Sequence, residues 1–253
     1  MPALWCGDVM FRVDYELLDD QVVVVASTGR VALPLASGSV AEFYKRFVDA
    51  VAPLGIPPPR TTVETEIPDA PHLDVDRETR AYDAMVVRRV WAALASAARA
   101  LNDWQSSYRG PRSSVGIMWG GFDLYAARYN GREVKPPSTA PIFQQNGMMA
   151  EVVAVGLDLG DKRSHTASLF AYISPPPEGI ATATFGVEGA AFNASAGLIS
   201  LPWESVRTSQ DPHATLLAFA DGVYDAAVRL GGWPRELVGP RIDGWYASTH
   251  RLS

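Results

Sequence analysis

The sequence predicts an α+β fold in which a mainly antiparallel sheet carries three main helices. Two observations support this fold class. Short apolar segments recur along the chain, and turn residues such as Thr28-Gly29 separate them, which is typical of strands. Three longer segments instead repeat their apolar residues with the 3.6-residue period of a helix. We expect one α+β domain over residues 1–253.

The first part of the chain predicts a three-stranded antiparallel meander followed by a helix. The strands are expected within residues 11–35, where apolar alternation gives way to a continuous apolar run. The helix begins at a capping box, in which Ser39 precedes Glu42 by three residues. It ends at about Leu54, because Gly55 follows and three prolines come soon after.

A long second helix is predicted between two strands. It begins at Asp83, whose side chain caps its first turn, and runs to about Tyr108. Before it, residues 61–70 predict a polar strand. After it, residues 113–132 predict a strand that runs into a two-residue hairpin turn at Asn130-Gly131, a dipeptide typical of such turns.

The remainder of the chain predicts a loop, further strands and a last helix. The proline-rich loop at residues 136–147 is either a lid over a pocket or a plain surface connection. The last helix starts at Asp211-Pro212 and ends at Gly231-Gly232, and the tail beyond it is irregular. The strands are expected within residues 150–160, 167–174, 181–192 and 197–203.

Two segments of the chain share one arrangement. A hairpin that ends in Leu-Pro, a loop and an amphipathic helix that ends in Leu-Gly occur at residues 27–55 and again at residues 195–231. We infer pseudo-duplicated halves, at about residues 9–60 and 165–235, joined by the long helix and the central strands. Chance is the alternative, because glycine turns and Leu-Pro ends are common.

Composition excludes several classes of function. The net charge is −6 and no basic tract occurs, so we expect no nucleic-acid partner. The single cysteine, Cys6, excludes an intrachain disulfide and a cysteine zinc cluster, and it fits a cytoplasmic location. The start of the chain lacks the features of a signal peptide, and no apolar run is long enough to span a membrane. A homodimer is possible.

We expect no metal and no cofactor. The four histidines lie in predicted loops or at helix starts, without the spacing of metal ligands. The Gly-Gly stretches lack the spacing of a phosphate loop, and no dinucleotide fingerprint opens a helix.

Acidic residues among aromatic ones remain as candidates for a site. Alternation along a strand places Glu151 on one face with Val153 and Val155. The same alternation predicts two aromatic faces, one formed by Trp119, Asp123, Tyr125 and Tyr129 and one by Phe170 and Tyr172. A carboxylate in an aromatic wall loses hydration, which raises its pKa toward the range of a general acid or base.

We expect these acidic and aromatic residues to act in catalysis and in substrate binding. Asp123 or Glu151 would transfer a proton, and Tyr172 or Arg128 would orient the substrate. The expected catalytic residues are therefore Asp123, Glu151 and Tyr172, and the expected substrate-binding residues are Trp119, Tyr125, Arg128 and Phe170. In the alternative interpretation, Asp123 or Glu151 forms a structural ion pair with Arg77, Arg128 or Arg132, as buried carboxylates usually do.

Several short motifs resemble those of an uncharacterised bacterial family, the domain of unknown function 5996 family. The main motif is Trp119-Gly120-Gly121-Phe122-Asp123-Leu124, followed by Arg128 and Gly131-Arg132. The resemblance covers most of residues 11–235 and implies no established activity. Members of the family have a longer tryptophan- and histidine-rich start and tend to have histidine where this chain has Thr79, Gly116 and Ala150. The resemblance therefore implies a divergent member that does not use such histidines.

Three classes of function follow from these observations. The first is an enzyme of the isomerase, cyclase or lyase type, independent of metal and nucleotide, that acts on a small organic substrate such as a secondary metabolite in an aromatic-lined pocket. The alternative is a non-catalytic small-molecule-binding protein that uses the same pocket. The third is an assembly partner, which would expose a large apolar patch.

Overall fold

The computed structural model describes residues 3–64, 69–118, 122–140, 145, 147–160 and 165–241. The chain forms two compact units, Met1–Ala92 and Ala93–Ser253. Helices and antiparallel sheets occur in it, which confirms the predicted α+β class. The single domain over the whole chain and its duplicated halves stay predictions.

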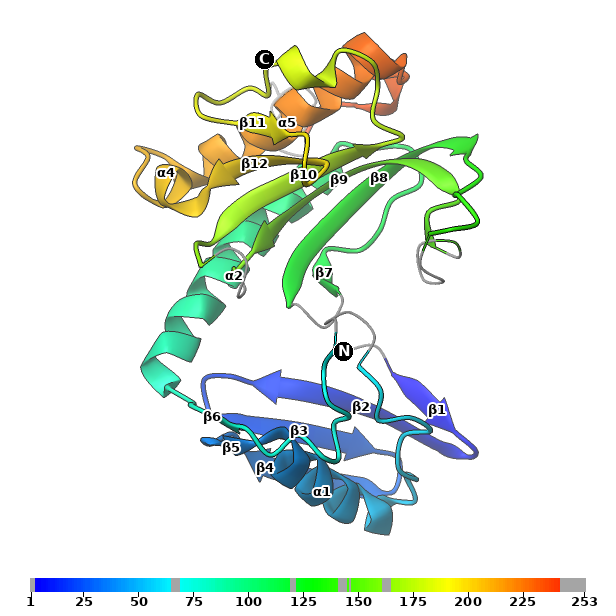
Figure 1. Cartoon of the computed structure of the whole chain (residues 1–253), viewed down its shortest axis with the longest axis vertical. Helices are drawn as coiled ribbons and strands as arrows, with labels where there is room; N and C mark the ends of the chain where they lie inside the picture. Colours follow the sequence, from blue (N-terminus) through cyan, green and yellow to red (C-terminus); the bar gives the residue numbers. More distant parts are fainter. Residues whose placement is uncertain are drawn as a thin grey trace, which may run out of the picture. The chain divides into compact units, whose positions relative to one another are not determined.

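The first unit contains the predicted meander. Its four-stranded antiparallel sheet follows the order of the chain: β1 (Leu4–Cys6), β2 (Val9–Glu16), β3 (Gln21–Ala26) and β4 (Gly29–Pro34) (Figure 1). The strands β2 to β4 are those expected within residues 11–35. A second, two-stranded sheet pairs β5 (Gly38–Ser39) with β6 (Thr79–Arg80).

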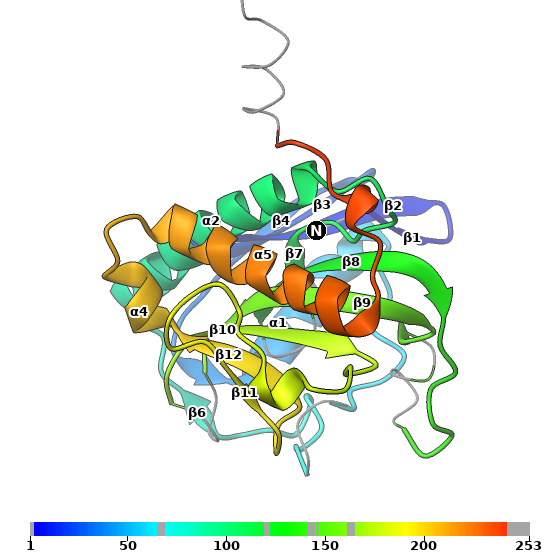
Figure 2. The same ribbon diagram turned by 90° about the horizontal axis from the view of Figure 1, so that it is seen from above.

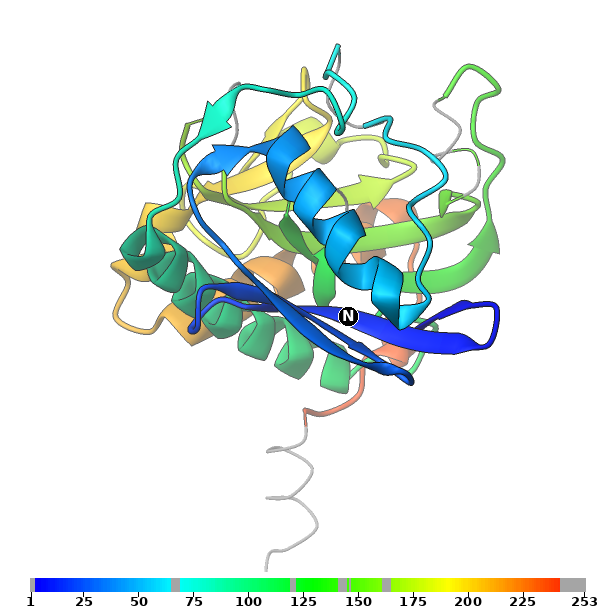
Figure 3. The same ribbon diagram turned by 90° about the horizontal axis from the view of Figure 1, so that it is seen from below.

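Helix α1 (Val40–Val51) begins at the predicted capping box. The Ser39 hydroxyl accepts a hydrogen bond from the backbone N–H of Glu42 at 3.2 Å, and the Glu42 carboxylate accepts one from the backbone N–H of Ser39 at 3.0 Å. A 3₁₀ turn, η1 (Ala52–Leu54), leads to Gly55, which has φ +79°. The helix packs on one face of the meander, where Val24 and Val51 are buried together (Figure 3).

The polar strand predicted at residues 61–70 is wrong for the part that the structure describes. Residues 61–64 and 69–70 are irregular. Among these residues only Val63 and Ala70 are apolar, so a strand there would bury little apolar surface. The second strand of the small sheet is instead β6, which follows later in the chain.

The second unit is built on a six-stranded antiparallel sheet. Its order is β11-β12-β10-β9-β8-β7. The strands are β7 (Gly116–Met118), β8 (Asp123–Glu133), β9 (Ala150–Asp158), β10 (Ser168–Ser174), β11 (Ala191–Asn193) and β12 (Leu198–Pro202).

The hairpin turn predicted at Asn130-Gly131 is wrong. Met118 pairs with Asp123 across an antiparallel ladder, so the chain reverses between β7 and β8. Asn130 and Gly131 lie inside β8, at a register shift of the ladder with β9 between Tyr129 and Glu133. Gly131 has φ +86°, a conformation that a β-bulge uses as readily as a turn. The Asn-Gly dipeptide thus marks a bulge.

The strand predicted at residues 181–192 is also wrong over most of its length. A 3₁₀ turn, η2 (Ile180–Thr182), starts the segment, and only β11 at its end is extended. Gly186 has φ +77°, and a Cβ atom on it would lie 2.2 Å from the carbonyl oxygen of Ala218. Close contact between this backbone and a helix therefore replaces strand pairing.

Two long helices cover one face of the six-stranded sheet. Helix α2 (Ala84–Ser106) begins in the first unit and ends in the second, and α5 (Pro212–Gly231) follows the short α4 (Trp203–Arg207) (Figure 2). The His213 imidazole of α5 lies 2.9 Å from the Asp103 carboxylate of α2. The predicted caps of both helices, Asp83 and Asp211, accept hydrogen bonds from first-turn N–H groups. After α5 a 3₁₀ turn, η3 (Arg235–Leu237), follows.

We predict that Gly156→Ala destabilises the protein by about 3 kcal/mol. A Cβ atom at this position of β9 would lie 2.1 Å from the carbonyl oxygen of Leu124 and 2.5 Å from the Phe170 ring, so the strands must shift. The matched control is Gly116→Ala in β7, where a Cβ atom meets nothing within 4 Å. Urea titration measures the free energy of unfolding, and equal values for the two variants would contradict this packing.

Candidate functional site

Alternation along β8 separates two faces of the six-stranded sheet. Ala126 and Arg128 lie on one side, which we call the helix face because α2 and α5 cover it. Tyr125 and Tyr129 lie on the other side, which we call the tyrosine face. The ladder registers continue both faces across the sheet, so that Tyr172 of β10 also belongs to the tyrosine face. The two faces therefore hold separate sets of side chains.

A cavity of about 600 Å³ lies on the tyrosine face. Its wall combines three phenol rings with mainly apolar side chains from β7, β12 and the segment before β9. Among the lining residues are Tyr125, Tyr129, Tyr172, Met118, Met148 and Leu198. Ala127, Val152 and Ala154 form the buried floor against which the three tyrosines pack. The structure thus shows a cavity with three tyrosines in its wall, two of which, Tyr125 and Tyr172, are predicted site residues.

Two phenol groups meet at this cavity. The hydroxyl oxygens of Tyr125 and Tyr172 lie 3.2 Å apart and share a hydrogen bond. The tyrosines stand on β8 and β10, on either side of β9, and β9 presents only Ala154 and Gly156 between them. These small residues leave room for two long side chains to converge above β9.

Burial keeps both phenols neutral. Loss of hydration raises the pKa of Tyr125 far above its ordinary value of 10.0, and hydrogen bonding and charge repulsion from Tyr172 and Tyr129 add to the shift. Loss of hydration also raises the pKa of Tyr172, although its hydrogen bond with Tyr125 opposes this. The pair therefore offers O–H donors and lone pairs at neutral pH, and it is unsuited to act as a base.

The structure places Asp123 and Phe170 on the predicted face but not at the cavity. Asp123 is half-buried at the first position of β8, on the same side as Tyr125. Phe170 packs its ring against Gly156 on the same face. Neither residue belongs to the cavity wall formed by the described residues. Trp119, the remaining aromatic candidate of this face, lies outside the described residues.

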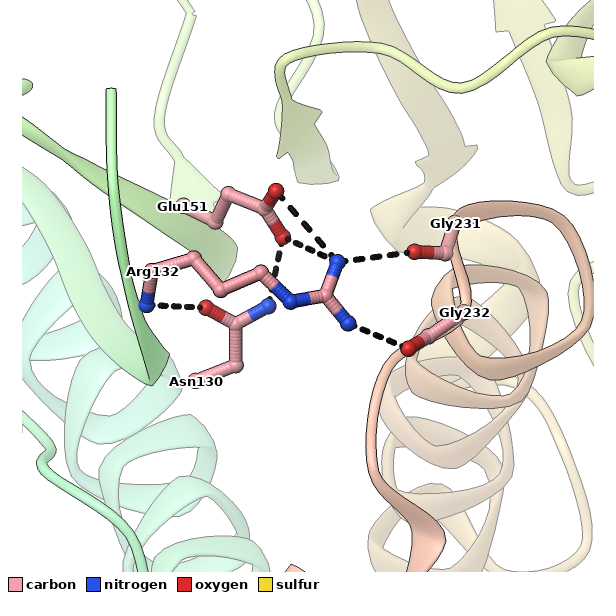
Figure 4. A network of polar contacts seen from close by, with 5 residues as sticks. All are labelled: Asn130, Arg132, Glu151, Gly231 and Gly232. Atoms are coloured by element: carbon pink, nitrogen blue, oxygen red, sulfur yellow. Dashed lines mark hydrogen bonds and ion pairs between the residues drawn. The ribbon is translucent and has the colours of Figure 1, made fainter.

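Glu151 does not join the tyrosines, and the catalytic role expected for it is not supported by its position. Figure 4 shows its carboxylate in a polar network with Asn130 and Arg132. The Asn130 amide donates to it at 2.5 Å, and Arg132 Nη1 lies 3.3 Å away. Arg132 also donates to the carbonyl groups of Gly231 and Gly232 at the end of α5. The structure thus contains an ion pair of Glu151 with Arg132, one of the pairs named in the alternative interpretation.

Arg128 also lies away from the tyrosine cavity, contrary to the role in substrate binding expected beside Tyr125. Its side chain has 0% exposure on the helix face. The guanidinium carbon lies 3.8 Å from the centre of the Trp104 ring, 4.9 Å from that of Tyr108 and 5.2 Å from that of Tyr224. Because Arg128 and Tyr125 are an odd number of residues apart on one strand, they cannot share a face.

Several residues that line the cavity are not among the site residues predicted from the sequence. Tyr129 had a usable signal, because it follows Tyr125 by four residues on one strand and so points to the same side. Met118, Met148 and Leu198 gave no such signal. They reach the cavity from separate segments, and only the ladder registers bring these segments together.

The described residues contain neither a metal-ligand cluster nor a helix that could span a membrane. Within the described ranges, no group of three or more histidine, cysteine, aspartate or glutamate side chains is arranged to hold a metal ion. In the same ranges, no helix combines the length and the apolar character that crossing a membrane requires.

We predict that the tyrosine pair makes the protein sensitive to alkali. The pKa of each phenol is raised in the folded state, so its contribution to stability is complete below the unfolded value of 10.0 and is lost as pH rises through the folded value. The free energy of unfolding should therefore fall above pH 10, and less steeply in Tyr125→Phe. Denaturant titrations across this range measure it, with tyrosinate absorbance as a second readout. Equal slopes in the two proteins would refute the assignment.

We predict that Glu151→Gln destabilises the protein by about 1 kcal/mol, because it removes the charge that holds Arg132 and Asn130. The matched control is Glu204→Gln, which disrupts an exposed ion pair with Arg207 and should leave stability unchanged within error. Thermal and urea unfolding compare the two. A loss in the control as large as that in Glu151→Gln would count against the network.

Comparison with known proteins places the chain in one family. No curated protein and no solved structure matches it. Residues 2–240 match the family described as "Family of unknown function (DUF5996)", which covers nearly the whole chain. This match confirms the resemblance carried by the motif around Asp123, and the chain is a member of the DUF5996 family.

Proposed function

We propose that the second unit binds a small, mainly apolar organic molecule in the cavity of the tyrosine face. The observation that carries this proposal is the pair of Tyr125 and Tyr172 hydroxyl groups, 3.2 Å apart, in a cavity of about 600 Å³. Small-molecule sites usually combine an apolar wall with a few convergent polar groups, and their volumes are roughly 300–1,000 Å³. The tyrosine cavity fits both criteria.

The chemistry of the wall narrows the class of ligand. Apolar contacts with Met118, Met148 and Leu198 favour an apolar body, at about 25 cal/mol per Å² of surface removed from water. The two phenols are neutral and donate hydrogen bonds, so they favour an oxygen that accepts them, such as a ketone or a phenol oxygen. The hydrogen bond between the two phenols uses one of their O–H groups, so a ligand of this kind would accept a hydrogen bond from the other.

A second candidate function is an enzyme of the isomerase, cyclase or lyase type. The same observation favours it, because two neutral phenols are suited to stabilise an oxyanion that forms on a substrate carbonyl. In this proposal Tyr172 and Tyr125 hold the oxyanion, and a substrate that extends out of the cavity along the same face of the sheet gives up a proton to the Asp123 carboxylate. The reaction would need neither metal nor nucleotide.

We predict that Tyr125→Phe and Tyr172→Phe each weaken ligand binding about tenfold, the cost of one hydrogen bond. The first measurement is native mass spectrometry of the protein purified from its own host, followed by denaturing extraction to identify a retained molecule. Titration of that molecule into the variants then gives the dissociation constants. Tyr44→Phe in α1 of the first unit is the matched control.

The outcomes separate the two candidate functions. A retained molecule that is recovered unchanged after incubation supports binding alone. Conversion into a product, lost in Asp123→Asn while binding persists, supports the enzyme. The proposal fails if no ketone- or phenol-containing compound from a host extract stabilises the protein, or if the phenylalanine variants bind as tightly as Tyr44→Phe.

A further inference from the structure

A buried cation on the helix face lacks a full set of partners. Arg128 has no exposed surface, and its Nη2 donates to the carbonyl oxygen of Trp104 and to the Ser107 hydroxyl. Among the described residues, its Nε and Nη1 atoms have no hydrogen-bond partner. Buried guanidinium groups normally use these donors, because an unsatisfied charged donor is costly.

The aromatic rings around Arg128 supply only part of the missing stabilisation. Trp104, Tyr108 and Tyr224 face the guanidinium with their rings, and a cation–π contact stabilises the charge. The rings accept no conventional hydrogen bond from Nε or Nη1. Burial lowers the pKa of Arg128 to about 9, so the side chain remains a cation at neutral pH.

A cavity of about 270 Å³ borders this guanidinium. Two ion pairs line it: Asp221 lies 2.5 Å from Arg241, and Asp225 lies 3.0 Å from Arg235. Both aspartates are therefore neutralised by their own arginines. Counting Arg128, three arginines face two aspartates, which leaves one positive charge at the cavity.

We propose that this cavity binds a small oxyanion, a carboxylate or a phosphate group, on the free N–H groups of Arg128. The excess charge matches a singly charged anion, and arginine is well suited to hydrogen-bond such oxygens. The volume of about 270 Å³ lies just below the range of roughly 300–1,000 Å³ that is usual for small-molecule sites, so the ligand is small. This site lies on the opposite face of β8 from the tyrosine cavity and is independent of the function proposed there.

For an anion to reach Arg128, the Arg241 side chain at the edge of the cavity must move. Arg128 is fully covered, whereas Arg241 is about one-third exposed and is held by its pair with Asp221. An anion competes with Asp221 for both arginines, because the Asp221 carboxylate also interacts electrostatically with Arg128. Removing the charge of Asp221 should therefore strengthen binding of the anion.

The test is thermal unfolding of the whole chain at constant ionic strength, with sodium chloride replaced stepwise by sodium phosphate or by sodium acetate. We expect a saturable rise of the midpoint with at least one of these anions, and the one that acts identifies the group. Asp221→Asn should lower the dissociation constant of that anion about tenfold. Arg128→Gln should abolish the rise.

Controls keep the outcome decisive. Arg207→Ala removes an exposed arginine of the same unit and should bind the anion as the wild type does. Tyr125→Phe should also leave it unchanged, since it alters only the other face. If Arg128→Gln does not fold, the Asp221→Asn shift decides. No rise beyond chloride in either the wild type or Asp221→Asn, or an equal rise in every variant, overturns the proposal.

Discussion

The architecture of the second unit depends on one buried cation. Arg128 projects from β8, the neighbour of the edge strand β7, into the layer of helices, where Trp104 of α2 and Tyr224 of α5 contact its guanidinium. A charge in this position is stable only if the surrounding rings and carbonyl groups hold it tightly. The register of both helices over the sheet is therefore tied to a single side chain, and a cavity forms where its remaining donors are left unused.

Successive side chains of β8 point to opposite faces of the sheet, so the two cavities on these faces have different linings. Arg128 and its paired neighbours form a charged site on the helix face, whereas Tyr125 faces a largely apolar cavity on the other side. The small residues Ala154 and Gly156 of β9 let the phenols of Tyr125 and Tyr172 meet. Opposite faces of one sheet thus border two cavities that do not share a lining side chain.

Much of the tyrosine face could be predicted, whereas the placement of the charged candidates could not. Strand alternation alone assigns Tyr125 and Tyr129 to one side, and the structure confirms it. The pattern also left Glu151 open between an acid–base and a structural role, because both fit a carboxylate near aromatic residues. Its partners, Asn130 and Arg132, lie at the register shift between β8 and β9, and Arg132 in turn donates to carbonyl groups at the end of α5 (Figure 4). Long-range contacts of this kind leave no local pattern in the sequence.

The sequence by itself determined the α+β class, the capped helices and most strands, because caps, periodicity and alternation are local properties of the chain. Only the tertiary structure decided that Asn130-Gly131 is a bulge, since a positive φ suits a bulge and a turn equally. It also decided that the segment around Gly186 packs on α5 in place of forming a strand. The bulge depends on the register between β8 and β9, and the packing of Gly186 depends on its contact with α5. Both are contacts between segments that lie far apart in the sequence.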